Sequence, residues 1–371
     1  MTHALRRRPA ALLAVALLAT AGLSLNGAPA QAATAPGTVL SSTTAVLPPE
    51  LTPLATGKRI SYVTTAVNGT TITATGLVMT PKTGKVNKTV VWAHGTTGLA
   101  DQCAPSINSN VFWPEARAAV AALLGKGFTV AAPDYPGLGT SQSHPYLIGG
   151  SEARSIIDSV KAARSLDGSL STQYAIDGHS QGGQGALFAG ELAPSYDGNL
   201  VLKGVSAIAP VSNADLFAPL IPGTPGQGYL VMALYGLQAV DTTFSATSPL
   251  ANPAKQRTPV LTAGCLNEIL AAYQSLTAQQ LLVGGALSTP LVNELVHFVN
   301  PAQQPSSAPI LLIQGTDDEA VPYDITAGAL LPELQAYSQP VQFVPVQGAD
   351  HDGAVTATTS LVANWIAARF S

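Results

Sequence analysis

A pentapeptide with a central serine is the clearest chemical signal in the sequence. Gly178–Gly182 has the pattern G-x-S-x-G and lies directly between the apolar run Tyr174–Ile176 and a helix-compatible segment. In this context the pattern predicts a nucleophile elbow, in which glycines let the chain reverse sharply and hold Ser180 Oγ exposed. The backbone N–H of Gln181 then begins the helix and can stabilise an oxyanion. A glycine-rich turn without chemistry is the alternative interpretation.

A serine hydroxyl needs a base that takes its proton, and two histidines follow Ser180 in the sequence. Around such an elbow the chain order is serine, acid, histidine. His351 comes after the predicted strand Val341–Val346, at the strand end where active-site loops gather. His297 lies on an apolar helical stretch, where we expect a structural role. We therefore predict that His351 is the general base.

The acid that orients this base is expected after the next-to-last predicted strand. Three adjacent carboxylates occur there: Asp317, Asp318 and Glu319. The acid is typically the third residue after the glycine of this turn and stands shortly before Val-Pro, which favours Asp318, with Asp317 as the first alternative. Asp350 and Asp352 flank the histidine, but an immediate neighbour rarely presents its carboxylate to Nδ1. We expect these two residues to face solvent.

A second oxyanion donor is expected in the loop that follows the apolar run Thr89–Ala93. We predict the backbone N–H of Thr96, with Gly95 and Thr97 as alternatives one residue away. Asp134–Gly139 follows another strand at the same edge, and turn formation is its favoured interpretation. The histidines, cysteines and carboxylates lack the spacing of a metal site, so we expect neither a metal nor a cofactor.

Short apolar runs alternate with helix-compatible stretches and must position these residues. The runs are Thr89–Ala93, Phe128–Ala132, Tyr174–Ile176, Val205–Ala209, Ile310–Ile313 and Val341–Val346. The clearest helical stretches between them are Glu115–Leu124, Glu152–Leu166 and Gln184–Leu192. This alternation predicts an α/β architecture, with buried parallel strands covered by helices on both faces. Before it, Ile60–Val67 and Thr71–Met79 flank Asn68–Gly69, which predicts an antiparallel hairpin at the start of the sheet.

The connection after the run ending at Ala209 is about ninety residues long, far beyond an ordinary connection between elements. Its helical candidates are Tyr229–Ala239, Leu266–Leu276 and Pro290–Val299. We therefore predict a helical cap over residues 213–305, inserted into a core made of residues 56–212 and 306–371. Residues 33–55 are rich in proline, serine and threonine, which predicts an extended lead-in.

The composition suits a soluble, exported protein without a nucleic-acid partner. The 371 residues are 46% hydrophobic and 10% charged, with a net charge of -4 and no basic cluster beyond the N-terminus. Arg6–Arg8 precede the apolar run Ala10–Leu18, and Ala30–Ala32 offers small residues for cleavage. These features predict a signal peptide over residues 1–32, and an uncleaved anchor is the alternative.

The sequence contains two cysteines, Cys103 and Cys265. An even number of cysteines in an exported chain favours disulfide formation, because the compartment is oxidising. We therefore predict one disulfide between them. Two free buried thiols are the alternative.

Several of these features occur together in one known family. The features are Asp134-Tyr135-x-Gly-x-Gly, Gly178-x-Ser180-Gln181-Gly182-Gly183, the large cap, and Asp318-Glu319-x-Val321-Pro322 followed by His351. Over roughly residues 45 to 371, the chain resembles the secretory lipase family of the α/β-hydrolase superfamily. The resemblance implies hydrolysis of acylglycerols or simpler carboxylic esters. It also implies that the cap forms an acyl-binding tunnel and controls access to it.

The leading prediction is a secreted lipase or esterase that works through an acyl-enzyme. An exported serine peptidase or an acyltransferase can use the same triad and is the alternative. A non-catalytic binding protein is disfavoured, because this chain keeps all three triad residues. We expect a monomer that takes an ester or lipid substrate and makes transient contact with a lipid interface.

Overall fold

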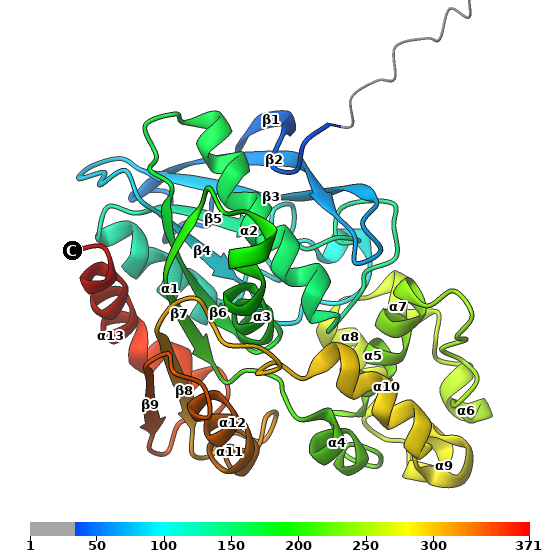
Figure 1. Cartoon of the computed structure of the whole chain (residues 1–371). Helices are drawn as coiled ribbons and strands as arrows, with labels where there is room; N and C mark the ends of the chain where they lie inside the picture. Colours follow the sequence, from blue (N-terminus) through cyan, green and yellow to red (C-terminus); the bar gives the residue numbers. More distant parts are fainter. Residues whose placement is uncertain (1–33) are drawn as a thin grey trace, which may run out of the picture. The chain divides into compact units, whose positions relative to one another are not determined.

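One 9-stranded sheet, in the order β1-β2-β3-β5-β4-β6-β7-β8-β9, organises the chain. The computed structural model describes residues 34–371, so the predicted signal peptide, residues 1–32, lies outside the described residues. The strands are β1 (Val39–Ala45), β2 (Ala55–Thr65), β3 (Thr71–Pro81), β4 (Thr89–Ala93), β5 (Thr129–Pro133), β6 (Gln173–His179), β7 (Val201–Ile208), β8 (Ile310–Gly315) and β9 (Val341–Val346). Neighbours among β1, β2, β3 and β5 are antiparallel, and neighbouring strands from β5 to β9 are parallel (Figure 1).

Helices cover both faces of this sheet, as predicted. On one face α2 (Gly149–Leu166) and α3 (Gln181–Tyr196) pack against the strands, and on the other face α1 (Pro114–Gly125) and α13 (Gly353–Arg369) do so. Strand side chains alternate between the two layers, because successive residues of a strand point to opposite sides. In β4, for example, Val91 joins the α2 and α3 side, whereas Trp92 joins the α1 and α13 side.

Two strands differ from the sequence prediction. Residues 33–55 were expected to be an extended lead-in, but they contain β1, which pairs with β2. β1 buries neither face fully, so it lacks the apolar alternation that reveals a strand. β9 was expected to be buried, but it lies at the end of the sheet and its residues are half-buried or exposed.

The segment between β7 and β8 is helical, and we call residues 213–305 the cap. Its elements are α4 (Ala214–Phe217), η2 (Ala218–Leu220), α5 (Gln227–Val240), α6 (Asn252–Lys255), α7 (Val260–Ala263), α8 (Leu266–Tyr273), α9 (Ala278–Leu281), η3 (Val283–Gly285) and α10 (Thr289–Val299). Figure 1 shows α5 to α10 gathered in one group, in yellow-green to orange. They pack around an apolar cluster in which Leu234 and Ile269 are fully buried and which also includes Tyr146, Val211 and Val321 of the core.

The remaining helices lie in loops of the core. They are η1 (Asp101–Cys103), α11 (Tyr323–Ile325), η4 (Thr326–Leu330, a π-helix) and α12 (Leu331–Gln335). Among residues 34–371, none of the helices has both the length and the apolar character needed to cross a membrane.

Candidate active site

Ser180 lies at the sharp turn between β6 and α3, as the pentapeptide predicts. Its backbone has φ 57° and ψ -118°, a conformation that non-glycine residues rarely adopt and that stores strain at functional sites. A Cβ at Gly178 would collide with the carbonyl of Gly182, and a Cβ at Gly182 would collide with the carbonyl of Ala93. The turn is held by a hydrogen bond of 2.9 Å from Ser180 N–H to the carbonyl of Ile208.

Asp318 and His351 meet at the ends of β8 and β9. His351 Nδ1 lies 2.7 Å from Asp318 Oδ2, and the Asp318 side chain is fully buried. Three further donors fix this carboxylate: Gln314 Nε2 at 2.8 Å and the backbone N–H groups of Ala320 and Val321, each at 2.8 Å. With Nδ1 engaged, Nε2 is the ring nitrogen of His351 outside this contact, and Ser180 lines the same two cavities as His351.

The other candidate acids and bases do not take part in the Asp318–His351 contact. Asp317 is exposed and accepts a hydrogen bond from Thr316 Oγ1. Glu319 is exposed, and so is His297 in the last turn of α10. Asp350 caps the start of α13, where its Oδ1 accepts from the N–H of Gly353 at 2.7 Å.

Thr96 borders Ser180 in the loop that follows β4. It is buried and lines both cavities that open at the serine, whereas Gly95 lines one of them. Its hydroxyl lies 2.8 Å from Tyr146 OH, and its carbonyl accepts from Trp113 Nε1 at 3.2 Å. The backbone of Thr97 is directed to the cap, since its carbonyl accepts from Leu266 N–H. Thr96 remains the predicted oxyanion donor, with Gly95 and Thr97 as the alternatives.

The Gln181 side chain is locked by a buried network that sequence reasoning missed. Its Nε2 donates to Glu152 Oε1 at 2.8 Å and to His144 Nε2 at 3.2 Å. His144 Nδ1 lies 2.7 Å from the carbonyl of Pro136, which can only accept, so the proton is on Nδ1 and Nε2 is the acceptor. Burial lowers the pKa of His144 to about 4, which keeps this tautomer neutral. These hydrogen bonds hold the side chain of Gln181, whose backbone N–H is the expected oxyanion donor.

Glu152 is a buried acid in that network. Burial raises its pKa to about 8, against the opposing effect of the hydrogen bonds from Gln181 and from the backbone of Leu147. It is therefore mainly protonated at neutral pH. No short-range pattern connects Glu152, His144 and Gln181, because they come from three different segments that only the fold brings together.

Asp134 has the structural role that was favoured for its loop. It is buried, and it accepts hydrogen bonds from Thr75 Oγ1 at 2.7 Å and from Ser106 N–H at 2.9 Å. These bonds join β3, the turn after β5 and the loop after β4. Tyr135 next to it has φ 67° and donates its hydroxyl to the carbonyl of His94 at 2.9 Å.

His179 packs against the candidate base. The rings of His179 and His351 are 4.5 Å apart, and His179 Nε2 donates to the carbonyl of His351 at 3.2 Å. Burial, and next the neighbouring His351 ring, lower the pKa of His179 well below its usual range. Atoms of His179, His351 and Asp352 that could bind a metal ion lie within 4.8 Å of one another. Sequence spacing did not predict this group. Because the carbonyl contact occupies His179 Nε2, we assign no metal to it.

Two cavities of different character meet at Ser180, His351, Thr96 and Tyr229. The first, which we call the apolar pocket, is narrow and lies between the core and the cap. Its walls include Leu147, Val211, Phe217, Ile221, Leu230 and Leu295. The second, which we call the mixed chamber, has a volume of about 390 Å³. Its walls combine polar residues with apolar ones: Glu115, His179, Asn267 and Asp352, and Trp113, Pro114, Leu266 and Leu270.

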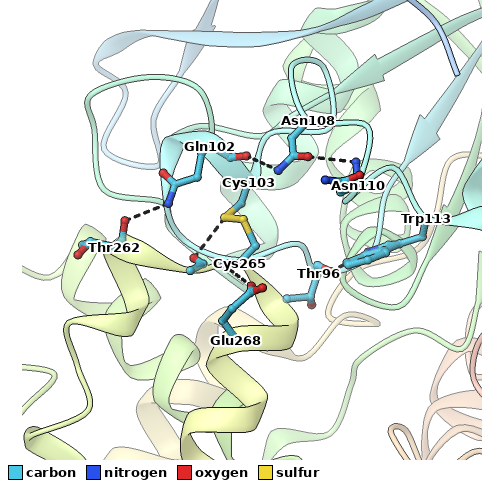
Figure 2. The surroundings of a disulfide bond; sticks show 10 residues. Thr96, Gln102, Cys103, Asn108, Asn110, Trp113, Thr262, Cys265 and Glu268 are labelled. Carbon is cyan, nitrogen blue, oxygen red and sulfur yellow. Dashed lines mark hydrogen bonds between the residues drawn. A yellow bond between two sulfur atoms is a disulfide. The ribbon is translucent and has the colours of Figure 1, made fainter.

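Cys103 and Cys265 form the predicted disulfide, which joins the loop after β4 to the N-cap residue of α8 in the cap (Figure 2). Gln102 Nε2 also donates to the carbonyl of Thr262 at 3.0 Å across the same junction. Figure 2 shows Thr96 and Trp113 beside this link. The disulfide therefore fixes the loop that carries the expected oxyanion donor against the cap.

The family of this chain follows from its match to a known protein family. The family described as "Secretory lipase" matches residues 114–371. The chain belongs to the secretory lipase family. This match confirms the resemblance inferred from the motifs, and it spans the elbow, the cap, Asp318 and His351.

Two relatives of the chain are secreted lipases of Malassezia globosa. Secreted triacylglycerol lipase LIP4 is 27% identical over 286 residues, which cover 72% of this chain and 61% of the relative. Secreted triacylglycerol lipase LIP7 is 25% identical over 340 residues, which cover 84% of this chain and 70% of the relative. The chain thus spans about three fifths of the length of LIP4. The family and both relatives confirm the prediction of a secreted protein.

Solved structures confirm the predicted fold. Candida antarctica lipase A superimposes with a TM-score of 0.73 at 20% identity, covering 86% of this chain and 78% of that chain. The rice cell wall degrading esterase LipA from Xanthomonas oryzae superimposes with a TM-score of 0.74 at 20% identity, covering 91% of this chain and all of that chain. This chain therefore has the α/β-hydrolase fold.

Proposed function

We propose that this protein is a secreted serine hydrolase that cleaves carboxylic esters through an acyl-enzyme. The observation that carries the proposal is the buried Asp318–His351 pair, 2.7 Å apart, whose histidine shares an apolar pocket with the strained Ser180. A nucleophile, a base and an acid that orients the base are the components of acyl transfer at a serine. Family membership and the names of the relatives agree with ester substrates.

In the first half of the reaction, Ser180 Oγ attacks the ester carbonyl carbon and its proton passes to His351 Nε2. Asp318 holds the ring in the tautomer that leaves Nε2 free to accept, and it stabilises the imidazolium. The backbone N–H groups of Gln181 and Thr96 donate to the developing oxyanion. The tetrahedral intermediate then collapses, and the alcohol leaves with the proton from His351.

In the second half, water attacks the acyl-enzyme and gives its proton to His351. The carboxylic acid leaves, and Ser180 Oγ recovers a proton from the same histidine. No cofactor takes part in either half. The atoms that balance the reaction are supplied by the ester and one water molecule.

The apolar pocket is the proposed acyl site. Its aliphatic and aromatic walls bury an acyl chain, and each buried methylene contributes about 0.8 kcal/mol. Phe217 and Ala218 line this pocket, and the adjacent Leu216 and Leu220 are exposed. We propose that this short helical segment makes the transient contact with a lipid interface, because its exposed leucines are next in sequence to residues that line the pocket.

Hydrolysis of p-nitrophenyl esters from acetate to palmitate tests the function. We expect the purified mature protein to cleave at least one of them, and we expect Ser180→Ala to lower kcat by about 10⁶-fold, as loss of a serine nucleophile does. The matched control is Ser195→Ala, an exposed serine near the end of the same helix, which should keep wild-type rates.

A second measurement separates this function from its alternatives. An active-site phosphonate should label Ser180 in the wild type and leave Ser180→Ala unlabelled. If the wild type cleaves none of the esters but hydrolyses peptide p-nitroanilides, the peptidase alternative holds. A protein that fails to react with the phosphonate argues against any serine hydrolase.

A further inference from the structure

Gln314 is a buried polar residue in an otherwise apolar stretch of β8. The four residues before it, Ile310–Ile313, are apolar and buried, and Gln314 itself is fully buried. Burial of an amide is unfavourable unless its polar atoms have partners. Gln314 lines neither of the two cavities that open at Ser180, so it does not contact a substrate bound there.

The amide of Gln314 has a partner for each of its polar groups. Its Nε2 donates to Asp318 Oδ2 at 2.8 Å and to the carbonyl of Val321 at 2.9 Å, and its Oε1 accepts from Thr326 Oγ1 at 2.8 Å. An amide nitrogen has two N–H groups, so both are engaged. The opposite orientation would place Oε1 against a carboxylate and a carbonyl, which can only accept. These contacts therefore favour one orientation, with the N–H groups toward the acid.

Thr326 distinguishes the two ends of this amide. It is fully buried and begins η4, the π-helical segment that follows the acid turn. π-Helical turns are rare and occur frequently at functional sites. The Thr326 hydroxyl donates to Oε1, whereas the other two partners of Gln314 can only accept. Loss of this hydroxyl would leave Oε1 buried without a partner and remove the contact that selects its position.

The contact from Gln314 falls on the carboxylate oxygen that faces the base. Asp318 Oδ2 accepts from Gln314 Nε2 and lies 2.7 Å from His351 Nδ1. A donor on that oxygen offsets part of its negative charge, so less of this charge is left to stabilise a protonated imidazole. The same donor restricts rotation of the carboxylate, against which the ring is aligned. Without it, the protonated form of His351 is favoured and its orientation is less fixed.

We propose that Gln314, held in one orientation by Thr326, is a positioning residue of the triad: it orients the Asp318 carboxylate and sets the pH above which His351 can accept the serine proton. The proposal rests on the proposed ester hydrolysis and deepens it, because it names two residues outside the triad that control the base.

Other titratable groups also face the Asp318–His351 pair. They come from β6, α1, α5, the acid turn and the start of α13, and are His179, Glu115, Tyr229, Asp317, Glu319, Asp350 and Asp352. Substitutions at Gln314 and Thr326 keep all of them. A difference in pH dependence between these variants and the wild type therefore comes from the contacts of Gln314.

The pH dependence of p-nitrophenyl butyrate hydrolysis tests the proposal. Gln314→Met keeps the size of the side chain and removes the amide, so kcat should fall about tenfold while KM stays within about twofold of wild type. The acid limb of kcat/KM should move to higher pH by about one unit, because one hydrogen bond to an ionised group changes a proton equilibrium by about a factor of ten. Thr326→Val should move the limb in the same direction by a smaller amount, and Thr326→Ser should restore the wild-type profile.

Two matched controls lose buried hydrogen bonds elsewhere. Gln227 in α5 is a fully buried glutamine whose Nε2 donates to two carbonyls of the cap. Thr358 in α13 is a buried threonine whose hydroxyl donates to a carbonyl of its own helix. Gln227→Met and Thr358→Val should lower the stability to urea and leave the acid limb at its wild-type position.

An unmoved acid limb in a folded Gln314→Met variant overturns the proposal and assigns Gln314 a purely structural role, and so does a loss confined to KM. A wild-type profile in Thr326→Val overturns the orienting role of Thr326. If Gln314→Met does not fold, the comparison of Thr326→Val with Thr326→Ser carries the test.

Inactivity of the wild type on every ester is instead a failure of the proposed function. In that case the titration of His351 is followed by NMR on protein with ¹³C-labelled histidine, and the His351 resonance is assigned by its loss in His351→Ala. A titration midpoint about one pH unit higher in Gln314→Met than in the wild type supports the proposal. Equal midpoints reject it.

Discussion

Ser180, Asp318 and His351 follow strands β6, β8 and β9 at one edge of the sheet, which we call the catalytic edge. This edge and the cap are held by different forces. At the edge, buried polar groups are fixed one by one: Asp318 accepts from Gln314 and two backbone amides, and Gln181 is held by Glu152 and His144. Such networks are directional and are strongly destabilised when one partner is removed.

The cap is instead held mainly by an apolar cluster and by one covalent link to the core. Apolar packing is non-directional and tolerates changes that conserve volume. The difference suggests that the chemistry is fixed by the core, whereas substrate preference can change through cap residues without loss of the triad. Predictions that separate the two regions test this view.

The largest effect is expected at the catalytic edge. Asp318→Asn should lower kcat on p-nitrophenyl butyrate by about 10⁴-fold, because an amide at this position favours the wrong tautomer of the base. The circular dichroism spectrum should stay unchanged. The matched control is Asp317→Asn, the exposed neighbour, which should remain close to wild type. If the loss follows Asp317 instead, the acid is misassigned despite the contact between Asp318 and His351.

The next effect is expected where the two regions are joined. The double variant Cys103→Ala and Cys265→Ala should lose up to about 5 kcal/mol of unfolding free energy, since the disulfide closes a loop of 162 residues. Urea unfolding measures this loss. Activity in the absence of denaturant should fall less than tenfold, because Leu266 N–H still bonds to Thr97 and Gln102 still reaches Thr262. Loss of activity in a fully folded variant would show that the disulfide itself positions the oxyanion loop.

The same contrast explains what the sequence could predict. The elbow, the acid turn and the final histidine each follow a short apolar strand, so local signals place Ser180, Asp318 and His351 at one edge. Strands β4 and β9 were predicted with their observed bounds, and β5 to β8 within a few residues. The cap was predicted only as a long helical insertion, because short helices such as α6 and α9 carry little periodic signal.

The residues around the triad were harder to predict. Glu115, Glu152 and Tyr229 lie near the starts of α1, α2 and α5, where polar residues normally face solvent. Their role depends on cavities formed by segments distant in sequence. The long helix α13 was also missed, because its buried face includes Ala354, Thr358 and Ala363, and alanine and threonine also occur on its other faces, so the sequence shows little apolar periodicity.

The smallest effect concerns the buried acid behind the elbow. The folded-state pKa of Glu152 is about 8, above the value of 4.5 expected in the unfolded chain. The folded protein therefore keeps a proton that the unfolded chain releases, so this contribution to stability is complete below about pH 4.5 and is lost as pH rises through about 8. Glu152→Gln has no proton to lose and keeps an acceptor for Gln181.

We therefore expect Glu152→Gln to match the wild type or be slightly less stable at pH 5, and to be more stable than the wild type at pH 9 by on the order of 1 to 3 kcal/mol. Thermal unfolding at both pH values measures the difference, with the exposed Glu294→Gln as the control that should show no such change. A difference that is the same at pH 5 and pH 9 would mean that Glu152 titrates normally in the folded protein. The catalytic edge would then contain a buried charge, and the argument that neutral directional bonds fix Gln181 would have to be replaced by one in which a carboxylate holds it.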